Sequence, residues 1–232
     1  MSKPSKKVGK NRSRKPTLEQ IVPATDAQRV AVGLMEDKQV VVMEGLAGTG
    51  KTFLAIHHAL TKLFKGDVRK IILTRPLTTV GNEKLGFLPG DVNEKVGPYA
   101  EQMLEYLEEF SPMISFMDAK EMADQIEFIP LAYLRGRNFK DSVIIADEMQ
   151  NSSYIQMKTL LTRIAETTQL LILGDTKQKD IPGKEDNGLD DLLYRMSTSP
   201  GTKEYFGHIR FGIEDIQRSE LVKHVMRMYD EI

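Results

Sequence analysis

The chain of 232 residues contains no cysteine. It can therefore form neither disulfide bonds nor thiolate zinc sites, which fits a cytoplasmic protein. It has no apolar run near 18 residues, so we expect no membrane-spanning helix. The amino-terminal stretch is not apolar, and we expect no secretory signal there. Hydrophobic residues at 41% are enough to build a core.

Acidic residues are absent from positions 1–16, which hold seven of the 32 lysines and arginines. The rest of the chain carries 25 basic and 33 acidic residues, a net charge of −8. We expect a disordered basic arm over 1–17 and one domain over 18–232. Such an arm suits non-specific binding of nucleic acid, but a solubilising tail has the same composition.

The most informative stretch is the sequence GLAGTGKT at 45–52, which follows an apolar run and precedes a helical pattern. Its glycines let backbone N–H groups turn toward phosphate oxygens at a helix amino terminus. Lys51 is placed to reach the β- and γ-phosphates, and the Thr52 hydroxyl to ligate Mg²⁺. A simple glycine-rich turn is the alternative, and the flanking elements argue against it. The predicted nucleotide-binding residues are Gly45, Leu46, Ala47, Gly48, Thr49, Gly50, Lys51 and Thr52.

An acidic pair ends a second apolar run, at 143–146. An aspartate in this position holds the metal beside a phosphate loop, so we assign Asp147 to Mg²⁺ together with Thr52. Glu148 is placed to orient or deprotonate the attacking water, and this pair is typical of hydrolysing ATPases. Two solvated acids after a core strand would be the alternative.

Two glutamines are candidates for the same site. Gln178 follows the apolar run 170–173 and could sense the γ-phosphate, so it joins Lys51 and Glu148 in the predicted catalytic set. Gln28 lies on the first turn of a helix capped by Thr25. It either reads the adenine edge or is simply solvated.

The apolar runs do not alternate with polar residues, which indicates strands buried on both faces. Interspersed with helices, they predict an α/β fold with a mostly parallel sheet. Strands are expected at 40–43, 70–74, 126–130, 143–146, 170–173 and 208–211. Helices are expected at 25–35, 53–64, 99–109, 117–124, 153–165, 189–196 and from 214 or 219 to 229, with a long irregular connection at 77–100. Because ligands bind at the carboxyl ends of parallel strands, the phosphate loop, Arg75, Asp147, Glu148 and Asp175 should meet at one edge.

Phosphoryl transfer often uses an arginine, from the same chain or a neighbouring subunit. The sequence does not choose among its candidates. They are Arg75, Arg135, Arg137, Arg163 and Arg218.

Taken together, these motifs resemble the PhoH family of ATPases over residues 20–232. The resemblance rests on the segments GLAGTGKTFLA at 45–55, TRP at 74–76, EKLGFLPGD at 83–91, PLAYLRGR at 130–137, DEMQN at 147–151, MK at 157–158 with LTR at 161–163, and GD at 174–175 with Gln178. Met149 departs from the usual alanine. Ser219-Glu220 follows Arg218 where a His-Pro pair is common.

The resemblance implies a RecA-like P-loop core related to superfamily 1 helicases, with ATP and Mg²⁺ as ligands and ATP hydrolysis as the reaction. It also implies homo-oligomers, with a hexameric ring among the family's assemblies. Some members carry a nuclease domain, but only about twenty residues precede this core, so we expect no nuclease activity. The compact size is similar to bacteriophage-encoded members, which would place the protein in a host cytoplasm.

Three functions therefore stand as hypotheses. The first is an ATPase motor acting on RNA or single-stranded DNA. The second is an ATP-dependent switch or assembly factor for a protein partner, without movement along a strand. The third, a nucleotide-binding scaffold without hydrolysis, is disfavoured by the intact pair Asp147 and Glu148.

Overall fold

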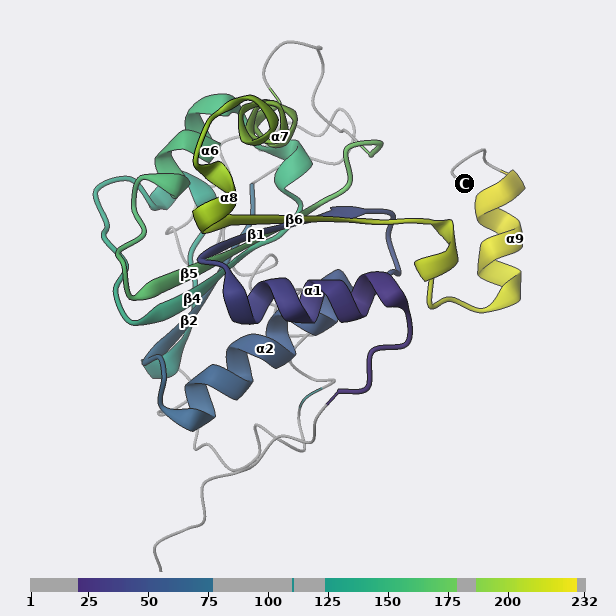
Figure 1. Cartoon of the computed structure of the whole chain (residues 1–232), viewed down its shortest axis with the longest axis horizontal. Coiled ribbons are helices and arrows are strands. Elements are labelled where there is room, and N and C mark those ends of the chain that lie inside the picture. Colours follow the sequence, from purple (N-terminus) through teal and green to yellow (C-terminus); the bar gives the residue numbers. More distant parts are fainter. Residues whose placement is uncertain (1–20, 77–109, 111–123, 179–186, 229–232) are drawn as a thin grey trace, which may run out of the picture.

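A six-stranded sheet forms the centre of the molecule in this computed structural model, which describes residues 21–76, 110, 124–178 and 187–228 (Figure 1). The strands are β1 (Val40–Gly45), β2 (Lys70–Thr74), β3 (Ile126–Phe128), β4 (Ser142–Ala146), β5 (Thr168–Gly174) and β6 (Phe206–Phe211). The helices are α1 (Asp26–Asp37), α2 (Lys51–Lys65), α6 (Tyr154–Leu161), α7 (Gly188–Thr198), α8 (Thr202–Tyr205) and α9 (Glu220–Met228). Three short 3₁₀ turns are η1 (Leu131–Tyr133), η2 (Met149–Asn151) and η3 (Ile213–Asp215). The predicted arm at 1–17, the connection at 77–100 and the helices at 99–109 and 117–124 fall almost entirely outside the described residues.

Every pairing among these strands is parallel, in the order β3-β2-β4-β5-β1-β6. The prediction of a parallel α/β sheet is confirmed. The order also shows that β5 lies between β1 and β4. The carboxyl end of β5 is therefore the neighbour of both the glycine-rich loop and the acidic pair.

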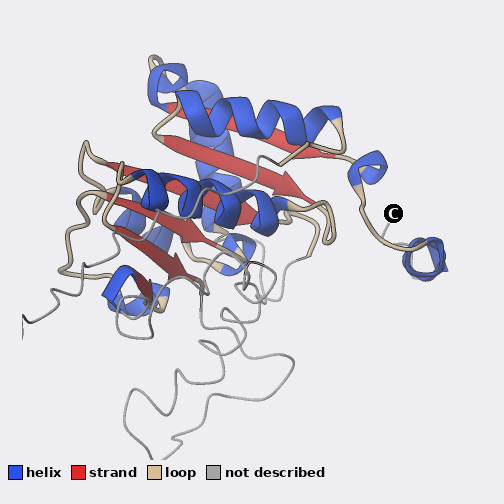
Figure 2. Cartoon of the chain, turned by 90° about the horizontal axis from the view of Figure 1, so that it is seen from below, coloured by secondary structure: helices blue, strands red, loops and turns tan. Residues whose placement is uncertain are grey.

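Helices cover both faces of the sheet (Figures 1 and 2). Side chains alternate along each strand, so successive residues of β1 enter different cores. Val41 and Met43 pack in the core that contains residues of α1 and α2. Val40 and Val42 pack in the core on the α6 and α7 side. No helix among the described residues is long and apolar enough to cross a membrane.

Side-chain caps fix where two of the helices begin. Thr25 caps α1 by accepting from the Gln28 N–H at 3.2 Å. Ser153 caps α6 in a reciprocal capping box with Gln156. The cap at Thr25 was predicted from the sequence, whereas the sequence left the cap of α6 open between Ser152 and Ser153. The two caps set the orientation of Gln28 and of the segment that follows Glu148.

The predicted end of one helix was wrong. Helix α6 ends at Leu161 instead of 165, because the backbone at 163–165 pairs with Phe139, whose carbonyl accepts from the Ala165 N–H at 3.1 Å. Of the two starts predicted for the last helix, Ser219 fits and Glu214 does not, because α9 begins at Glu220. The segment before it is the turn η3, closed by the Gly212 N–H donating to Asp215 Oδ2 at 2.8 Å. The four-residue helix α8 was not predicted.

Candidate functional site

The pocket at the carboxyl ends of β1, β4 and β5 has a volume of about 470 Å³. It gathers residues from distant parts of the sequence, as predicted. The predicted site residues that line this pocket are Gln28, Ala47, Gly48, Gly50, Lys51, Thr52, Asp147, Glu148 and Gln178. Gly45, Leu46 and Thr49 are not in its lining but shape the loop from behind through their carbonyl and hydroxyl oxygens.

Lys51 is the buried cation of this pocket. Its Nζ donates to the carbonyls of Gly45 at 2.7 Å and Leu46 at 2.8 Å. Burial lowers the pKa of Lys51, and the charges of Asp147, Asp175 and Glu148 oppose that shift. The ammonium thus lies within the loop, bound to oxygens that phosphate oxygens could replace.

The two predicted metal ligands are adjacent. The Thr52 hydroxyl donates to Asp147 Oδ2 at 3.1 Å, although 95 positions separate them. Asp147 Oδ1 accepts from the Glu148 N–H at 2.9 Å, which fixes the carboxylate. Mg²⁺ prefers hard oxygen ligands and usually takes only one or two from the protein, with water and phosphate completing the shell. A hydroxyl and a carboxylate at this distance fit that ion.

Glu148 has a left-handed backbone, with φ 55° and ψ 34°. This conformation is uncommon for a residue with a side chain and turns Glu148 away from the direction of Asp147. Burial, together with the neighbouring charge of Asp147, raises the pKa of Glu148. A carboxylate with a raised pKa is a better proton acceptor, as a general base requires.

Gln150 was noted in the sequence only as part of the DEMQN segment, yet it joins two strands of the site. Its Nε2 donates to Glu148 Oε2 at 2.6 Å, and its Oε1 accepts from the Asp175 N–H at 3.1 Å. The side chain is buried, with 2% of its surface exposed. The sequence signal was a polar residue directly after the acidic pair, but its partner on β5 depends on the strand order.

Asp175 and Gln178 occupy the middle of the site because β5 lies between β1 and β4. Asp175 Oδ1 accepts from the Lys177 N–H at 3.0 Å, while its buried Oδ2 has no hydrogen-bond partner among the described residues. Gln178 is exposed at the pocket rim, with its N–H donating to the Asp175 carbonyl at 3.1 Å. Both side chains line the pocket from the short turn that follows β5.

Gln28 supports the loop. Its Nε2 donates to the Thr49 carbonyl at 3.1 Å and its Oε1 accepts from the Ala24 N–H at 2.8 Å. It lines the pocket next to the apolar side chains of Ile21 and Phe53. Each end of the amide keeps one further hydrogen-bonding position, so Gln28 can brace the loop and still contact a base.

Of the five candidate arginines, Arg218 is the one that lines this pocket. A Cβ built on Gly48 would lie 2.7 Å from Arg218 Nε, so the arginine packs directly on the loop. The Gln217 N–H donates to the Gly48 carbonyl at 2.8 Å and holds the segment in place. A small core of Leu46, Ile216 and Met226 joins the same loop to α9.

The other four candidate arginines do not line the pocket. The charge of Arg75 lowers the pKa of Glu148, in opposition to the larger effect of burial. Arg137 pairs with Glu127 at 3.1 Å. Arg135 and Arg163 line a second groove between η1 and α6.

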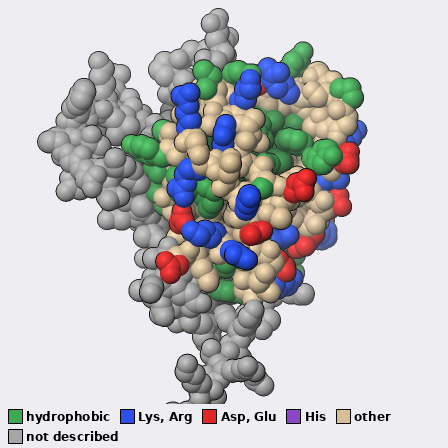
Figure 3. All heavy atoms as spheres, turned by 90° about the vertical axis from the view of Figure 1, so that its left-hand side faces the viewer, with side chains coloured by type: hydrophobic (Ala, Val, Ile, Leu, Met, Phe, Trp, Pro, Cys, Tyr) green, Lys and Arg blue, Asp and Glu red, His purple; other side chains and the backbone are tan. Residues whose placement is uncertain are grey.

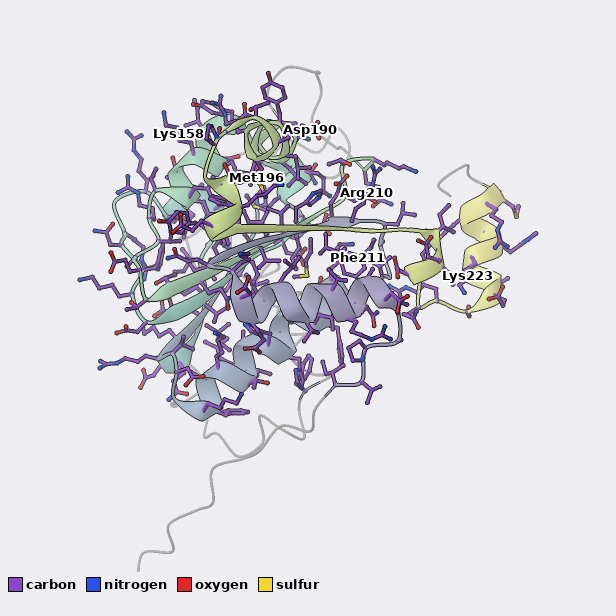
Figure 4. All side chains as sticks on the ribbon, in the orientation of Figure 1. Lys158, Asp190, Met196, Arg210, Phe211 and Lys223 are labelled. Carbon is purple, nitrogen blue, oxygen red and sulfur yellow. The ribbon has the colours of Figure 1, made fainter. Side chains whose placement is uncertain are left out.

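A buried glutamate lies behind the loop, on β1. Glu44 accepts from the Thr176 hydroxyl at 2.6 Å and interacts with His208 Nε2 at 3.1 Å, and Arg210 Nε lies 3.7 Å away. Chiefly the His208 hydrogen bond holds the pKa of Glu44 down at about 2. Arg210 and Phe211 project to opposite sides of β6 (Figure 4). This cluster ties the edge strand to the turn that carries Asp175; a lone acid in an apolar strand was its signal in the sequence.

Comparison with known proteins identifies the family. A family model described as PhoH-like protein matches residues 20–230. The chain belongs to the PhoH family. It is 37% identical over 211 residues to Protein PhoH of Escherichia coli K12, covering 90% of this chain and 58% of that protein. It is also 37% identical over 209 residues to the PhoH-like protein of Bacillus subtilis, covering 89% of this chain and 63% of that protein.

The chain spans about three fifths of the length of these two PhoH relatives. Among solved structures, the large terminase of a thermophilic bacteriophage superposes with a TM-score of 0.56 over 90% of this chain and 51% of its own. Identity to it is 12%, so this likeness shows the fold alone. The predicted RecA-like P-loop core is thereby supported by both the family and the fold.

Proposed function

We propose that this PhoH-family chain is a Mg²⁺-dependent ATPase whose turnover is coupled to RNA or single-stranded DNA. The observation that carries the proposal is the contact between the Thr52 hydroxyl and Asp147 Oδ2 at 3.1 Å, in a pocket shared with Lys51 and Glu148. A phosphate loop, two hard oxygen ligands and a base with a raised pKa are the parts that phosphoryl transfer to water requires.

Each residue of the site then has a defined task. The loop N–H groups and Lys51 bind the β- and γ-phosphates, and Lys51 exchanges the carbonyls of Gly45 and Leu46 for phosphate oxygens. Mg²⁺, when held by Thr52 and Asp147, neutralises charge on those phosphates. Glu148 accepts the proton of the attacking water, and Gln178 reports whether the γ-phosphate is present.

The test is a measurement of phosphate release from ATP with and without Mg²⁺, RNA and single-stranded DNA, on protein whose mass in solution is known. Lys51→Ala should abolish ATP binding, because the phosphate charge loses its direct partner. Glu148→Gln should keep binding and lower kcat by at least roughly 10²-fold, because the base is lost. Lys203→Ala and Glu204→Gln, exposed on α8, are matched controls that should turn over ATP like the unaltered protein.

Full turnover in Glu148→Gln would show that the water is activated elsewhere. Absence of any effect of nucleic acid at low salt would remove the coupling from the proposal and leave the ATPase standing.

A second candidate is an ATP-dependent switch for a protein partner. It is favoured by α9, which lies apart from the sheet (Figures 1 and 2) and exposes Leu221, Val222, Val225 and Met228. Because Met226 packs with Leu46 of the loop, a bound nucleotide could change the position of α9 and so the exposure of its apolar side chains. An ATP-dependent change in solution mass that Leu221→Asp abolishes, without any nucleic-acid effect, would favour this function.

A further inference from the structure

The second groove of the molecule lies between η1 and α6 and has a volume of about 510 Å³. It is separate from the nucleotide pocket, with which it shares no lining residue. In Figure 4, Lys158 of this groove lies on the α6 layer, well separated along the sheet from Arg210 at the carboxyl end of β6. The groove is therefore a distinct surface.

Its charge is of one sign. Arg135, Lys158 and Arg163 line it, and no acidic side chain does so among the described residues. Lys and Arg side chains also predominate over the upper part of the face in Figure 3, on the side of the α6 and α7 layer. The groove thus concentrates positive charge on a chain whose net charge is −1.

These three cations lack the acidic partners that others nearby have. Arg137 and Lys70 both pair with Glu127, and Arg195 pairs with Asp191 at 2.7 Å. In the described part of the chain, by contrast, Arg135, Lys158 and Arg163 form no ion pair. The buried Nε of Arg163 has no hydrogen-bond partner there. Arg135 and Lys158 are also exposed, so both cations are available to an anionic ligand.

The groove also has apolar and aromatic lining, from Leu131, Ala132, Tyr154 and Ile155, beside the neutral polar Gln156, Thr159 and Thr162. Ile155 is 70% exposed on α6, and Tyr154, the residue before it, supplies the aromatic ring of the groove. Lys158 Nζ lies 5.8 Å from the centre of the Tyr154 ring, which helps to hold the cation at the groove. Cations that follow a backbone, together with apolar surface for flat rings, are the combination that binds single-stranded nucleic acid.

We infer that the groove between η1 and α6 binds a single strand of nucleic acid, with phosphates on Arg135, Lys158 and Arg163 and bases against Tyr154 and Ile155. This inference rests on the proposed function, and it assigns the binding of nucleic acid to a particular groove. Both walls are attached to the ATP site. The Leu131 N–H of η1 donates to the Arg75 carbonyl at 3.1 Å, and α6 starts at Ser153, directly after the segment that carries Glu148 and Gln150.

The test measures binding of fluorescein-labelled oligouridine and oligothymidine by anisotropy over a range of salt concentrations. The double variant Arg135→Glu/Lys158→Glu should weaken binding by at least tenfold. The neutral variant Arg135→Gln/Lys158→Gln should reduce the slope of log K against log salt by about 1.4, the value for two lost phosphate contacts on a single strand. A change in folding alone would not alter this slope in that way.

The matched control is Lys65→Glu/Lys203→Glu, which changes charge equally at exposed positions on α2 and α8. It should bind within twofold of the unaltered protein, and thermal melting checks that every variant folds. Equal affinity of groove and control variants would overturn the inference, and so would polyglutamate competing as well as oligouridine. If ATP is hydrolysed but no strand binds at low salt, the inference fails while the ATPase function stands.

Discussion

At the scale of single residues, Gln150 determines how Glu148 is held. Its amide donates to the charged form of that carboxylate at 2.6 Å, which lowers the pKa of Glu148 against the larger effect of burial. The same amide accepts from the Asp175 N–H. Gln150 is thus a positioning residue that connects the acidic pair with the turn bearing Gln178.

Replacement of Gln150 by leucine should shift the acidic limb of the plot of kcat against pH to higher pH. In the proposed reaction Glu148 acts as the base when it is deprotonated, so activity is present above its pKa and lost below it. Without the hydrogen bond the pKa rises further, and loss begins at a higher pH. The measurement is kcat for ATP between about pH 5 and 8.

Gln169→Leu is the control, because it removes a similarly buried amide that bonds to the carbonyls of Met35 and Lys38, far from the site. Both variants should lose about 1–3 kcal/mol of stability, since each leaves buried polar groups unpaired. Only Gln150→Leu should move the acidic limb. An unmoved limb would mean that Gln150 supports the fold and not the base.

At the scale of elements, the buried Glu44 connects β1, β5 and the edge strand β6. Its partners are His208 and Arg210 on β6 and Thr176 after β5. Through them the outermost strand is joined to the turn that bears Asp175. The cluster stabilises the wall behind the phosphate loop.

Substitution of Glu44 by glutamine should destabilise the protein in a pH-dependent way. The folded pKa of about 2 lies below the ordinary value of 4.5. The stabilisation is therefore complete above about pH 4.5 and is lost as the pH falls toward 2. After allowance for solvent around His208 and Arg210, we expect a loss of about 1–2 kcal/mol at pH 6.

Urea unfolding at pH 6 and pH 3 checks this expectation, with Glu204→Gln as an exposed control. The difference between the unaltered protein and Glu44→Gln should shrink at pH 3. A difference that stays constant with pH would show that glutamine disturbs packing and not charge.

The sequence predicted the elements of the site better than the links among them. Lys51, Thr52 and Asp147 could be placed together because each follows a parallel strand, and such strands end at one edge. The bridge from Gln150 to Asp175 depends on β5 lying between β1 and β4, which no local pattern encodes. Likewise, five arginines were equivalent in sequence, and only tertiary packing places Arg218 on Gly48.

A tertiary contact also decided where the sequence misjudged the end of a helix. Thr162 is compatible with a helix, but the residues after it leave the helix to pair with Phe139, which lies far away in the sequence. The periodic apolar pattern continued to Ile164, which packs beside the core from outside the helix. A periodic apolar pattern indicates which residues are buried, but a buried residue does not have to lie in a helix.

At the scale of the whole molecule, the nucleotide pocket draws on the amino-terminal helix, three strands and the segment before α9. Gln28, Lys51 and Arg218 reach it from elements that are otherwise far apart. A ligand that contacts all of them links these parts. Binding should therefore stabilise the entire domain and not one loop.

We expect ATP with Mg²⁺ at about 100 times its Kd to stabilise the folded chain by about 2.7 kcal/mol. For a domain of this size that corresponds to a rise in Tm of about 5–10 °C. Calorimetry measures the shift, and Lys51→Ala should show none. An equal shift with AMP would contradict a site organised around the β- and γ-phosphates.

The left-handed backbone at Glu148 bears on how such a chain evolves. Glycine would occupy φ 55° with less strain, by about 1 kcal/mol, so the backbone at this position favours glycine. Glycine has no carboxylate, however, and a lineage that accepted it would lose the proton acceptor. In the proposed reaction, the demands of backbone strain and of reaction rate therefore conflict at Glu148.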